Sequence, residues 1–362
     1  MTAAKAILGI FLVVFVLWDA FETIILPRRP RRGFRITRTF YNLTWQPWRA
    51  VARLLRNTKK RETFLSLYGP LSIFLLLAIW ALGLILGFAV LQWAAGSRLG
   101  GSMSQTFGSD LYFSGSSFFT LGLGDEAPQT NLARFLAVIE AGTGFGFLAL
   151  VISYVPVLYQ SFSRREVSIS LLDARAGTPP TGIELLRRHD GDMQEFTRIL
   201  IEWEHWSAEL LESHMSYPVL AYFRSQHDNQ SWLASLTAVL DASALCMVGI
   251  QNGPARQARL TFAIARHALV DLAQVFNTAP DKEIERLPAD DAPRMCEALR
   301  RAGLQLTSDA DASERLTKFR KMYEPYASAL ARHLFVELPP WIKPQTSADN
   351  WETSRWGRNT VI

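Results

Sequence analysis

The stretch of sequence that decides the fold runs from position 112 to position 125 and reads Tyr112-Phe113-Ser114-Gly115-Ser116-Ser117-Phe118-Phe119-Thr120-Leu121-Gly122-Leu123-Gly124-Asp125. Residues 111–119 predict a short apolar helix that is too short to cross a membrane. Gly122 and Gly124 alternate with other residues and permit unusual backbone angles, so consecutive carbonyl groups can face one axis. Such a segment between two membrane spans is typical of a re-entrant helix followed by an ordered loop.

Long hydrophobic runs lie on both sides of this segment. Residues 63–96 contain no charged side chain, and a bilayer core of ~30 Å needs about 20 helical residues. Residues 135–159 form a second run that only Glu140 interrupts. The two runs predict an outer and an inner membrane helix, with the re-entrant segment between them.

The N-terminal run, residues 6–27, predicts a further membrane helix that carries Asp19 and Glu22 near its C-terminal end. A signal peptide is the alternative, but no small-residue cleavage site precedes the arginine cluster that follows. Asp19 and Glu22 are i, i+3 neighbours and can share a helix face. We expect them to pair with local arginines near the inner interface, and direct coordination of an ion is the other interpretation.

The positive charge of the chain is concentrated after this helix, where no acid interrupts Arg28, Arg29, Arg31, Arg32, Arg35, Arg38, Arg49, Arg53, Arg56, Lys59, Lys60 and Arg61. A basic run between hydrophobic segments is typical of a cytoplasmic loop facing anionic membrane lipid, and no motif supports nucleic-acid binding. The N-terminus is then outside, and Arg164 and Arg165 place everything after residue 165 in the cytoplasm. Short loops and the lack of a targeting peptide favour a plasma membrane, namely the inner membrane of a bacterium.

Residues 36–57 predict a helix that lies in the inner membrane interface. Pro47 starts or kinks it. One face of this helix carries the apolar side chains of Trp48, Val51 and Leu55. Another face carries the basic side chains of Arg49, Arg53 and Arg56. A solvated basic linker is the alternative.

The quoted stretch resembles the pore loop of the potassium-channel family, in which a pore helix precedes a Thr-Val-Gly-Tyr-Gly-Asp filter. The resemblance covers residues 63–162 and implies an outer helix, a re-entrant pore helix, a filter and an inner helix. One pore loop per chain implies a homotetramer, in which rings of backbone carbonyls replace the hydration shell of K⁺. The resemblance implies these ion-binding filter residues: Thr120, Leu121, Gly122, Leu123 and Gly124.

Two departures from the family pattern leave the ion preference open. Leu121 replaces valine, which is a mild apolar change. Leu123 replaces a tyrosine that in relatives braces the filter with its hydroxyl, although leucine occurs in the second pore loops of some two-pore-domain channels. A potassium-selective channel is the expected function. The alternatives are a non-selective cation channel of the same architecture and a non-conducting membrane sensor or scaffold.

Three further residues of the pore module have more than one interpretation. Asp125 lies at the outer mouth, where it either concentrates cations, braces the filter by a hydrogen bond or is simply solvated. Gly144 is a candidate gating hinge in a run of small residues that also suits close helix packing. Glu140 is a carboxyl group within the membrane, which is costly unless paired or hydrated. It either hydrogen-bonds behind the filter or tunes ion occupancy, or it sits at the outer end of the helix, near water, with a structural partner.

The second half of the sequence predicts an α-helical cytoplasmic bundle with helices at residues 193–215, 231–250, 259–276, 293–306 and 312–338. Breaks are expected at 177–180, 252–254 and 339–340. No nucleotide-binding loop, hydrolase nucleophile or metal cluster is present, so we expect no enzyme activity, no cofactor and no metal beyond permeating K⁺. Cys246 and Cys296 suit reduced thiols in the cytosol. The cytoplasmic ligand is unknown.

The predicted fold class is therefore an all-α membrane protein with a potassium-channel-like pore module and an α-helical cytoplasmic domain. Its predicted parts are an N-terminal membrane helix (residues 1–27), a basic loop with an interfacial helix (28–62), the ion-channel pore module (63–162), a helical regulatory domain (163–345) and a flexible tail (346–362).

Overall fold

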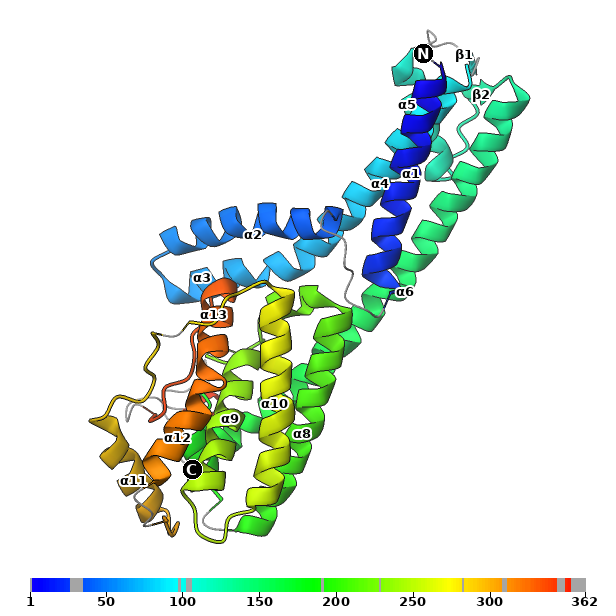
Figure 1. Ribbon diagram of the computed structural model, residues 1–362. Helices are drawn as coiled ribbons and strands as arrows, with labels where there is room; N and C mark the ends of the chain where they lie inside the picture. The colour runs from blue at the N-terminus through cyan, green and yellow to red at the C-terminus, as the bar shows by residue number, and fades with distance from the viewer. Residues whose placement is uncertain are drawn as a thin grey trace. The chain divides into compact units, whose positions relative to one another are not determined.

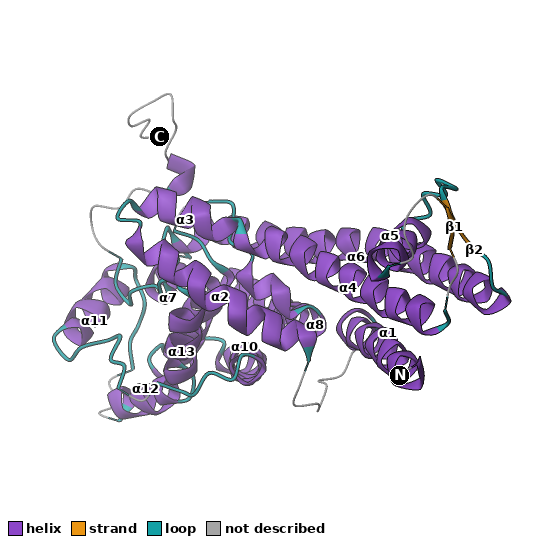
Figure 2. Ribbon diagram, turned by 90° about the horizontal axis from the view of Figure 1, so that it is seen from above, coloured by secondary structure: helices purple, strands orange, loops and turns teal. Residues whose placement is uncertain are grey.

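The computed structural model describes residues 2–26, 35–96, 99–101, 106–189, 192–227, 229–281, 283–307, 311–343 and 349–352. The chain forms two compact units, which we call the membrane unit (residues 1–56 and 63–160) and the helical unit (residues 57–62 and 161–362). Helices make up almost all of the described secondary structure (Figure 2). The predicted all-α class is confirmed, because each of the two strands has three residues. The arginines between positions 28 and 32 and most of the predicted tail lie outside the described residues.

The first half of the chain contains, in order, α1 (Thr2–Ile24), α2 (Ile36–Leu54), α3 (Thr58–Ser66), α4 (Tyr68–Ala94), β1 (Leu99–Gly101), α5 (Phe107–Phe118), β2 (Glu126–Pro128) and α6 (Asn131–Ala176). In the described part of the chain, three helical stretches are long and apolar enough to cross a membrane, namely α1, α3 with α4, and α6. These are the three runs that the sequence predicts. One difference is that α6 continues well beyond residue 159, to Ala176.

Helices α1 and α4 run side by side (Figure 1) and approach closely because glycines line their contact. A Cβ atom added to Gly83 would lie 2.9 Å from Val16 Cγ2, and one added to Gly87 would lie 2.7 Å from Val13 Cγ2. Small residues four positions apart let membrane helices pack backbone to backbone. Close packing joins α1 to α4, and retention of the first helix stays a prediction.

The acidic pair of α1 is buried in a polar cluster at the end of that helix. Asp19 Oδ2 accepts hydrogen bonds from Trp80 Nε1 at 3.0 Å and from Thr37 Oγ1 at 2.8 Å. Arg35 Nε lies 3.4 Å from Glu22 Oε2 and 4.0 Å from Asp19 Oδ1. The prediction that these acids pair with a local arginine is confirmed. The cluster ties α1 to α4 and to the start of α2.

Helix α2 packs on α3 and the start of α4 through aromatic rings. The Trp45 and Tyr68 ring centroids are 4.8 Å apart, and Trp48 stacks on Phe64 at 4.4 Å. The Trp48 indole is half-buried against α3, whereas Val51 is exposed. The outward apolar side chains of α2 are Leu43, Val51 and Leu54. Location in the membrane interface stays a prediction.

The second half of the chain contains, after α6, α7 (Gly182–Arg187), α8 (Met193–Ser216), the 3₁₀ helix η1 (Pro218–Tyr222), α9 (Trp232–Val248), α10 (Ala255–Val275), α11 (Asp291–Arg301), α12 (Ala312–Lys321), α13 (Glu324–Leu334) and the 3₁₀ helix η2 (Asn350–Glu352). Helix α9 is buried along nearly its whole length, and α7, α8, α10, α12 and α13 pack around it. The predicted helical bundle is thus observed, with α9 as its core.

Three predicted helices of the bundle have different boundaries, of which the one expected at 259–276 begins earlier, at Ala255. The helix expected at 293–306 ends at Arg301, and Gly303 follows with φ of +75°, which favours glycine after a helix end. The helix expected at 312–338 is two helices, because α13 starts anew at Glu324 with Pro325 in its first turn. Proline has no N–H to continue a helix and favours a first turn.

A buried ion cluster joins the core helix α9 to the chain around α13. Arg286 donates two hydrogen bonds to Asp241, at 3.1 and 2.8 Å, and a third to Glu324 at 3.2 Å. The Tyr323 hydroxyl also donates to Asp241. Burial, followed by the Asp241 charge, raises the pKa of Tyr323 well above its usual value. A buried charge with several partners is tolerated where an unpaired one is not.

Candidate functional site

Helix α5 precedes the glycine-containing loop. It spans Phe107–Phe118, 12 residues, and is about 18 Å long at 1.5 Å per residue, so it does not cross a bilayer core of ~30 Å. The residue before its first turn, Thr106, is the N-cap and has an extended backbone. Asp110 lies in the first turn, where a negative charge is favourable at the positive end of the helix dipole.

The loop after α5 has an alternating backbone. The φ angles of Thr120, Gly122 and Gly124 are +53°, +62° and +76°, and within this loop no other described residue has positive φ. Unusual backbone angles at both glycines were predicted, whereas the positive φ of Thr120 was not. Alternation at every second residue turns successive peptide planes in opposite senses, which can bring successive carbonyls to one side. All residues from 119 to 125 are exposed.

A hydrogen bond from α5 holds the end of this loop. The Tyr112 hydroxyl donates to Asp125 Oδ2 at 2.8 Å. Of the three interpretations of Asp125, the structure shows the bracing contact. The antiparallel pairing of β1 with β2 then follows directly, with Gly101 opposite Glu126. The loop is therefore fixed at its start by α5 and at its end by Tyr112 and the strand pair.

We expect Tyr112→Phe to weaken the loop without unfolding the protein. The substitution removes the exposed hydrogen bond that holds the end of the loop and leaves the aromatic ring in place. The expected result is an ion current that decays several-fold faster at constant voltage, with an unchanged melting temperature. Current as stable as in the wild type would show that this hydrogen bond does not hold the loop.

The inner face of α5 meets α6 at two positions one turn apart. Ser114 Oγ is hydrogen-bonded to Glu140 of α6, and it lies 2.7 Å from the backbone oxygen of Ile85 in α4. One turn on, a Cβ atom added to Gly144 would lie 1.9 Å from the Phe118 oxygen. Glu140 is fully buried and bonded to α5, so it does not sit near water; a role behind the filter stays a prediction. Gly144 is a close-packing position in a continuous helix, and its role as a hinge stays a prediction.

Much of the apolar surface of α6 is left uncovered by the described part of the chain. Within its most apolar stretch, 11% of the residues are buried, against 61% for α3 with α4. The side chains of Val138, Phe145 and Ile152 are 71%, 70% and 64% exposed. An apolar surface of this extent needs lipid or another protein chain to cover it.

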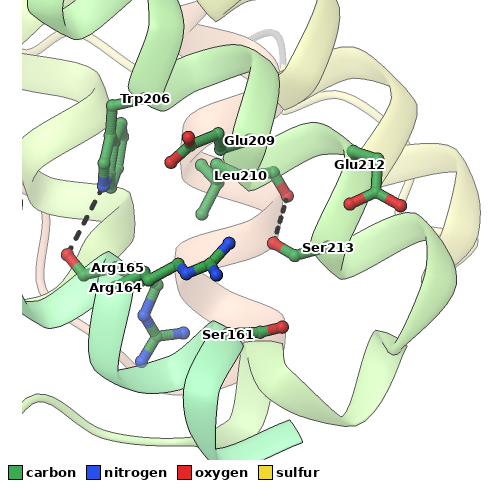
Figure 3. Close-up of a pocket in the computed structure, with 8 residues that line it drawn as sticks. All are labelled: Ser161, Arg164, Arg165, Trp206, Glu209, Leu210, Glu212 and Ser213. Atoms are coloured by element: carbon green, nitrogen blue, oxygen red, sulfur yellow. Dashed lines mark hydrogen bonds between the residues drawn. The ribbon is translucent and has the colours of Figure 1, made fainter. Parts of the chain in front are cut away.

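The helical unit has one feature at α6 that the sequence did not indicate. A pocket of about 90 Å³ lies between α6 and α8. Figure 3 shows its lining, which consists of Ser161, Arg164, Arg165, Trp206, Glu209, Leu210, Glu212 and Ser213. In the described part of the chain, no group of His, Cys, Asp and Glu side chains could hold a metal ion.

Arg165 anchors α6 in this unit. Its guanidinium donates to the backbone oxygens of Leu220 at 2.8 Å and Phe223 at 2.9 Å, and lies 3.2 Å from His214 Nε2. Burial and the Arg165 charge lower the pKa of His214 well below its usual value. Neutral His214 can then accept from Arg165 through Nε2 while Nδ1 donates to the Leu210 oxygen, which is 3.0 Å away.

Comparison with known proteins identifies similarity to ion channels. Residues 73–160 match the family model described as ion channel (Ion_trans_2), a range that runs from the first turns of α4, through α5 and the loop, into α6. The uncharacterised membrane protein YdjJ of Bacillus subtilis (strain 168) is 24% identical over 230 residues, which are 62% of this chain and 67% of that protein. No solved structure matches the chain. The chain is thus an all-α membrane protein whose pore module is similar to the ion channel family, which points to a channel and not to an enzyme.

Proposed function

We propose that this chain is one subunit of a homotetrameric potassium-selective channel. The observation that carries the proposal is the alternating backbone of the loop, with positive φ at Thr120, Gly122 and Gly124. Four such loops around one axis supply rings of backbone oxygens from residues 120–124, which replace the water around a dehydrated K⁺ ion. Backbone oxygens do not depend on the identity of the side chain, so Leu121 and Leu123 are compatible with this role.

The environment of the loop supports the same proposal. The C-terminal end of α5, which carries the negative end of the helix dipole, directly precedes the loop and favours a cation there. The Asp125 carboxylate adds negative charge after the loop. The extensively exposed span of α6 supports assembly, because copies of this helix can cover one another's apolar surface.

The proposed topology has the N-terminus outside the cell and the helical unit in the cytoplasm. It rests on the basic residues between α1 and α4 and on Arg164 and Arg165, since such residues resist translocation. The proposed location is a plasma membrane, the inner membrane of a bacterium. Because α6 continues into the helical unit, that unit is proposed to regulate the inner helix. A small ligand in the pocket between α6 and α8 would contact α6 directly.

A non-selective cation channel is the second candidate, and Leu123 favours it. Its side chain is 61% exposed and carries no hydroxyl with which to brace the loop. A looser loop would discriminate less between K⁺ and Na⁺ while still conducting both.

The reversal potential in planar bilayers, under opposed K⁺ and Na⁺ gradients, tests the proposal. A value near the K⁺ equilibrium potential supports selective K⁺ conduction. A value near zero with clear current replaces it with the non-selective channel. A purified tetramer that conducts neither ion at any voltage would favour the non-conducting sensor.

We expect Leu123→Tyr to sharpen the selectivity for K⁺. A hydroxyl at this position can make a hydrogen bond worth about 0.5–1.5 kcal/mol, which corresponds to a rise of up to about tenfold in the permeability ratio of K⁺ to Na⁺. Leu123→Phe is the matched control, because it adds the ring without the hydroxyl. An unchanged ratio in the tyrosine variant would show that the leucine does not limit selectivity.

A further inference from the structure

We propose that Glu140 is a neutral carboxylic acid and that its proton joins α6 to α5, which makes Glu140 a positioning residue for the helix before the loop. This proton contributes to the packing of the membrane unit whether the loop conducts K⁺, several cations or none.

Counting donors and acceptors around Ser114 gives the first argument. A serine hydroxyl has one hydrogen to donate. Ser114 Oγ contacts two groups, the Ile85 backbone oxygen at 2.7 Å and the Glu140 carboxyl. The Ile85 oxygen can only accept, so the serine hydrogen belongs to that bond. The second contact then needs a hydrogen from Glu140, and an ionised carboxylate has none to give.

The burial of Glu140 gives the second argument. Its exposed fraction is 0%, and its other oxygen, Oε2, has no hydrogen-bond partner among the described residues. A buried ionised carboxylate with an unsatisfied oxygen is far more costly than a neutral acid, so such groups keep a proton. The single hydrogen of Ser114 and the burial of Glu140 independently indicate a neutral carboxylic acid.

The charged and titratable groups of the neighbouring elements do not offer Glu140 a counter-ion. Helix α4 contains no acid, lysine, arginine or histidine. Helix α5 contributes another buried acid, Asp110, one turn before Ser114, together with Tyr112, which donates to Asp125. On α6 itself the nearest base is Arg134, whose Nε donates to the Pro128 oxygen at 3.0 Å.

The position of this contact explains what it does. Ser114 and Phe118 are one turn apart on α5, and they meet Glu140 and Gly144, which are one turn apart on α6. The α6 span has few other buried positions. The loop hydrogen-bonds back to the last turn of α5, since the Leu121 N–H donates to the Ser116 oxygen at 2.9 Å. The proton on Glu140 therefore fixes α5, and α5 fixes the start of the loop.

Infrared spectroscopy of the full-length protein in lipid nanodiscs tests the inference directly. The difference spectrum of wild type minus Glu140→Gln at neutral pH is expected to contain the carbonyl stretch of a protonated carboxylic acid. The matched control is Glu314→Gln, which removes an exposed glutamate on α12 and is expected to remove only carboxylate bands. Carboxylate bands alone in the Glu140 difference spectrum would overturn the inference.

Thermal unfolding of the same variants gives a second readout. Glu140→Gln keeps a hydrogen-bond donor for Ser114, so its melting temperature is expected to match the wild type at acidic pH, where the unfolded glutamate is protonated too, and to exceed it at neutral pH. Glu140→Leu lacks the donor and is expected to melt several degrees below Glu140→Gln. The folded wild type binds one more proton than the unfolded chain, so its stability falls as the pH rises. Glutamine does not titrate, so the stability of Glu140→Gln does not fall with pH for this reason. Equal pH dependence in wild type and Glu140→Gln would also overturn the inference.

Discussion

Replacing Gly124 or Gly122 by alanine is expected to abolish the ion current while the protein still folds and assembles. Both residues have φ in the left-handed region, at +76° and +62°. A residue with a Cβ atom pays about 1–2 kcal/mol in that conformation. In a tetramer the strain occurs four times around one axis. The loop is expected to leave the alternating conformation, and backbone oxygens that turn away no longer replace the water around an ion.

The loop around both glycines is open, so this loss does not come from a collision. An added Cβ would have no atom within 4 Å at either position, and α5 and the strand pair are untouched. Current in planar bilayers and assembly by size-exclusion chromatography are the two measurements. Gly108→Ala is the control, because its φ is not in the left-handed region and its Cβ would meet Thr106 Oγ1 at an ordinary 3.5 Å. Normal conduction in Gly122→Ala and Gly124→Ala would remove the filter assignment.

The main features of the membrane unit could be predicted because they depend on local chemistry. A charge-free run long enough to cross a bilayer predicts a membrane helix without any knowledge of its neighbours. In the same way, the two alternating glycines predict backbone angles that other residues avoid. Thr120 shows the limit of this reasoning. Nothing in a threonine indicates positive φ, and its conformation depends on the chain that follows it.

The contacts that position the loop could not be predicted, because they join residues far apart in sequence. Tyr112 reaches Asp125 across 13 positions, and Ser114 reaches Glu140 across 26. Sequence alone offered several interpretations for both acids, since the partner of a buried or semi-buried carboxyl depends on tertiary packing. Only the Asp19–Glu22 pair had an identifiable partner, because arginines were abundant in the adjoining loop.

In the helical unit, periodicity gave the helices but not every boundary. Amphipathic spacing predicted α8 to within a residue of its ends. The break between α12 and α13 was missed because apolar spacing continues across it. Pro325 is the local signal that could have located it, and the buried contact between Tyr323 and Asp241 holds the break in place.

The second large effect is expected at Gly144, where alanine should prevent correct packing of α5 on α6. The added Cβ would lie 1.9 Å from the Phe118 oxygen and 2.8 Å from its carbonyl carbon. Both are backbone atoms, which cannot rotate away as a flexible side chain can. Overpacking typically costs about 1–3 kcal/mol and occasionally more, and a collision with backbone belongs at the upper end. We expect a melting temperature lowered by several degrees and loss of both assembly and current.

The same substitution separates close packing from hinge motion at this position. A hinge needs glycine for its flexibility, so Gly144→Ala would stiffen α6, change the open probability and leave the melting temperature as it was. Close packing predicts instead that the melting temperature falls and that the tetramer fails to assemble, so no gating can be measured. Gly142→Ala is the matched control on the same helix, since its Cβ would meet no atom of the described residues within 4 Å. A stable, assembled Gly144→Ala protein with altered gating would refute the packing role and establish the hinge.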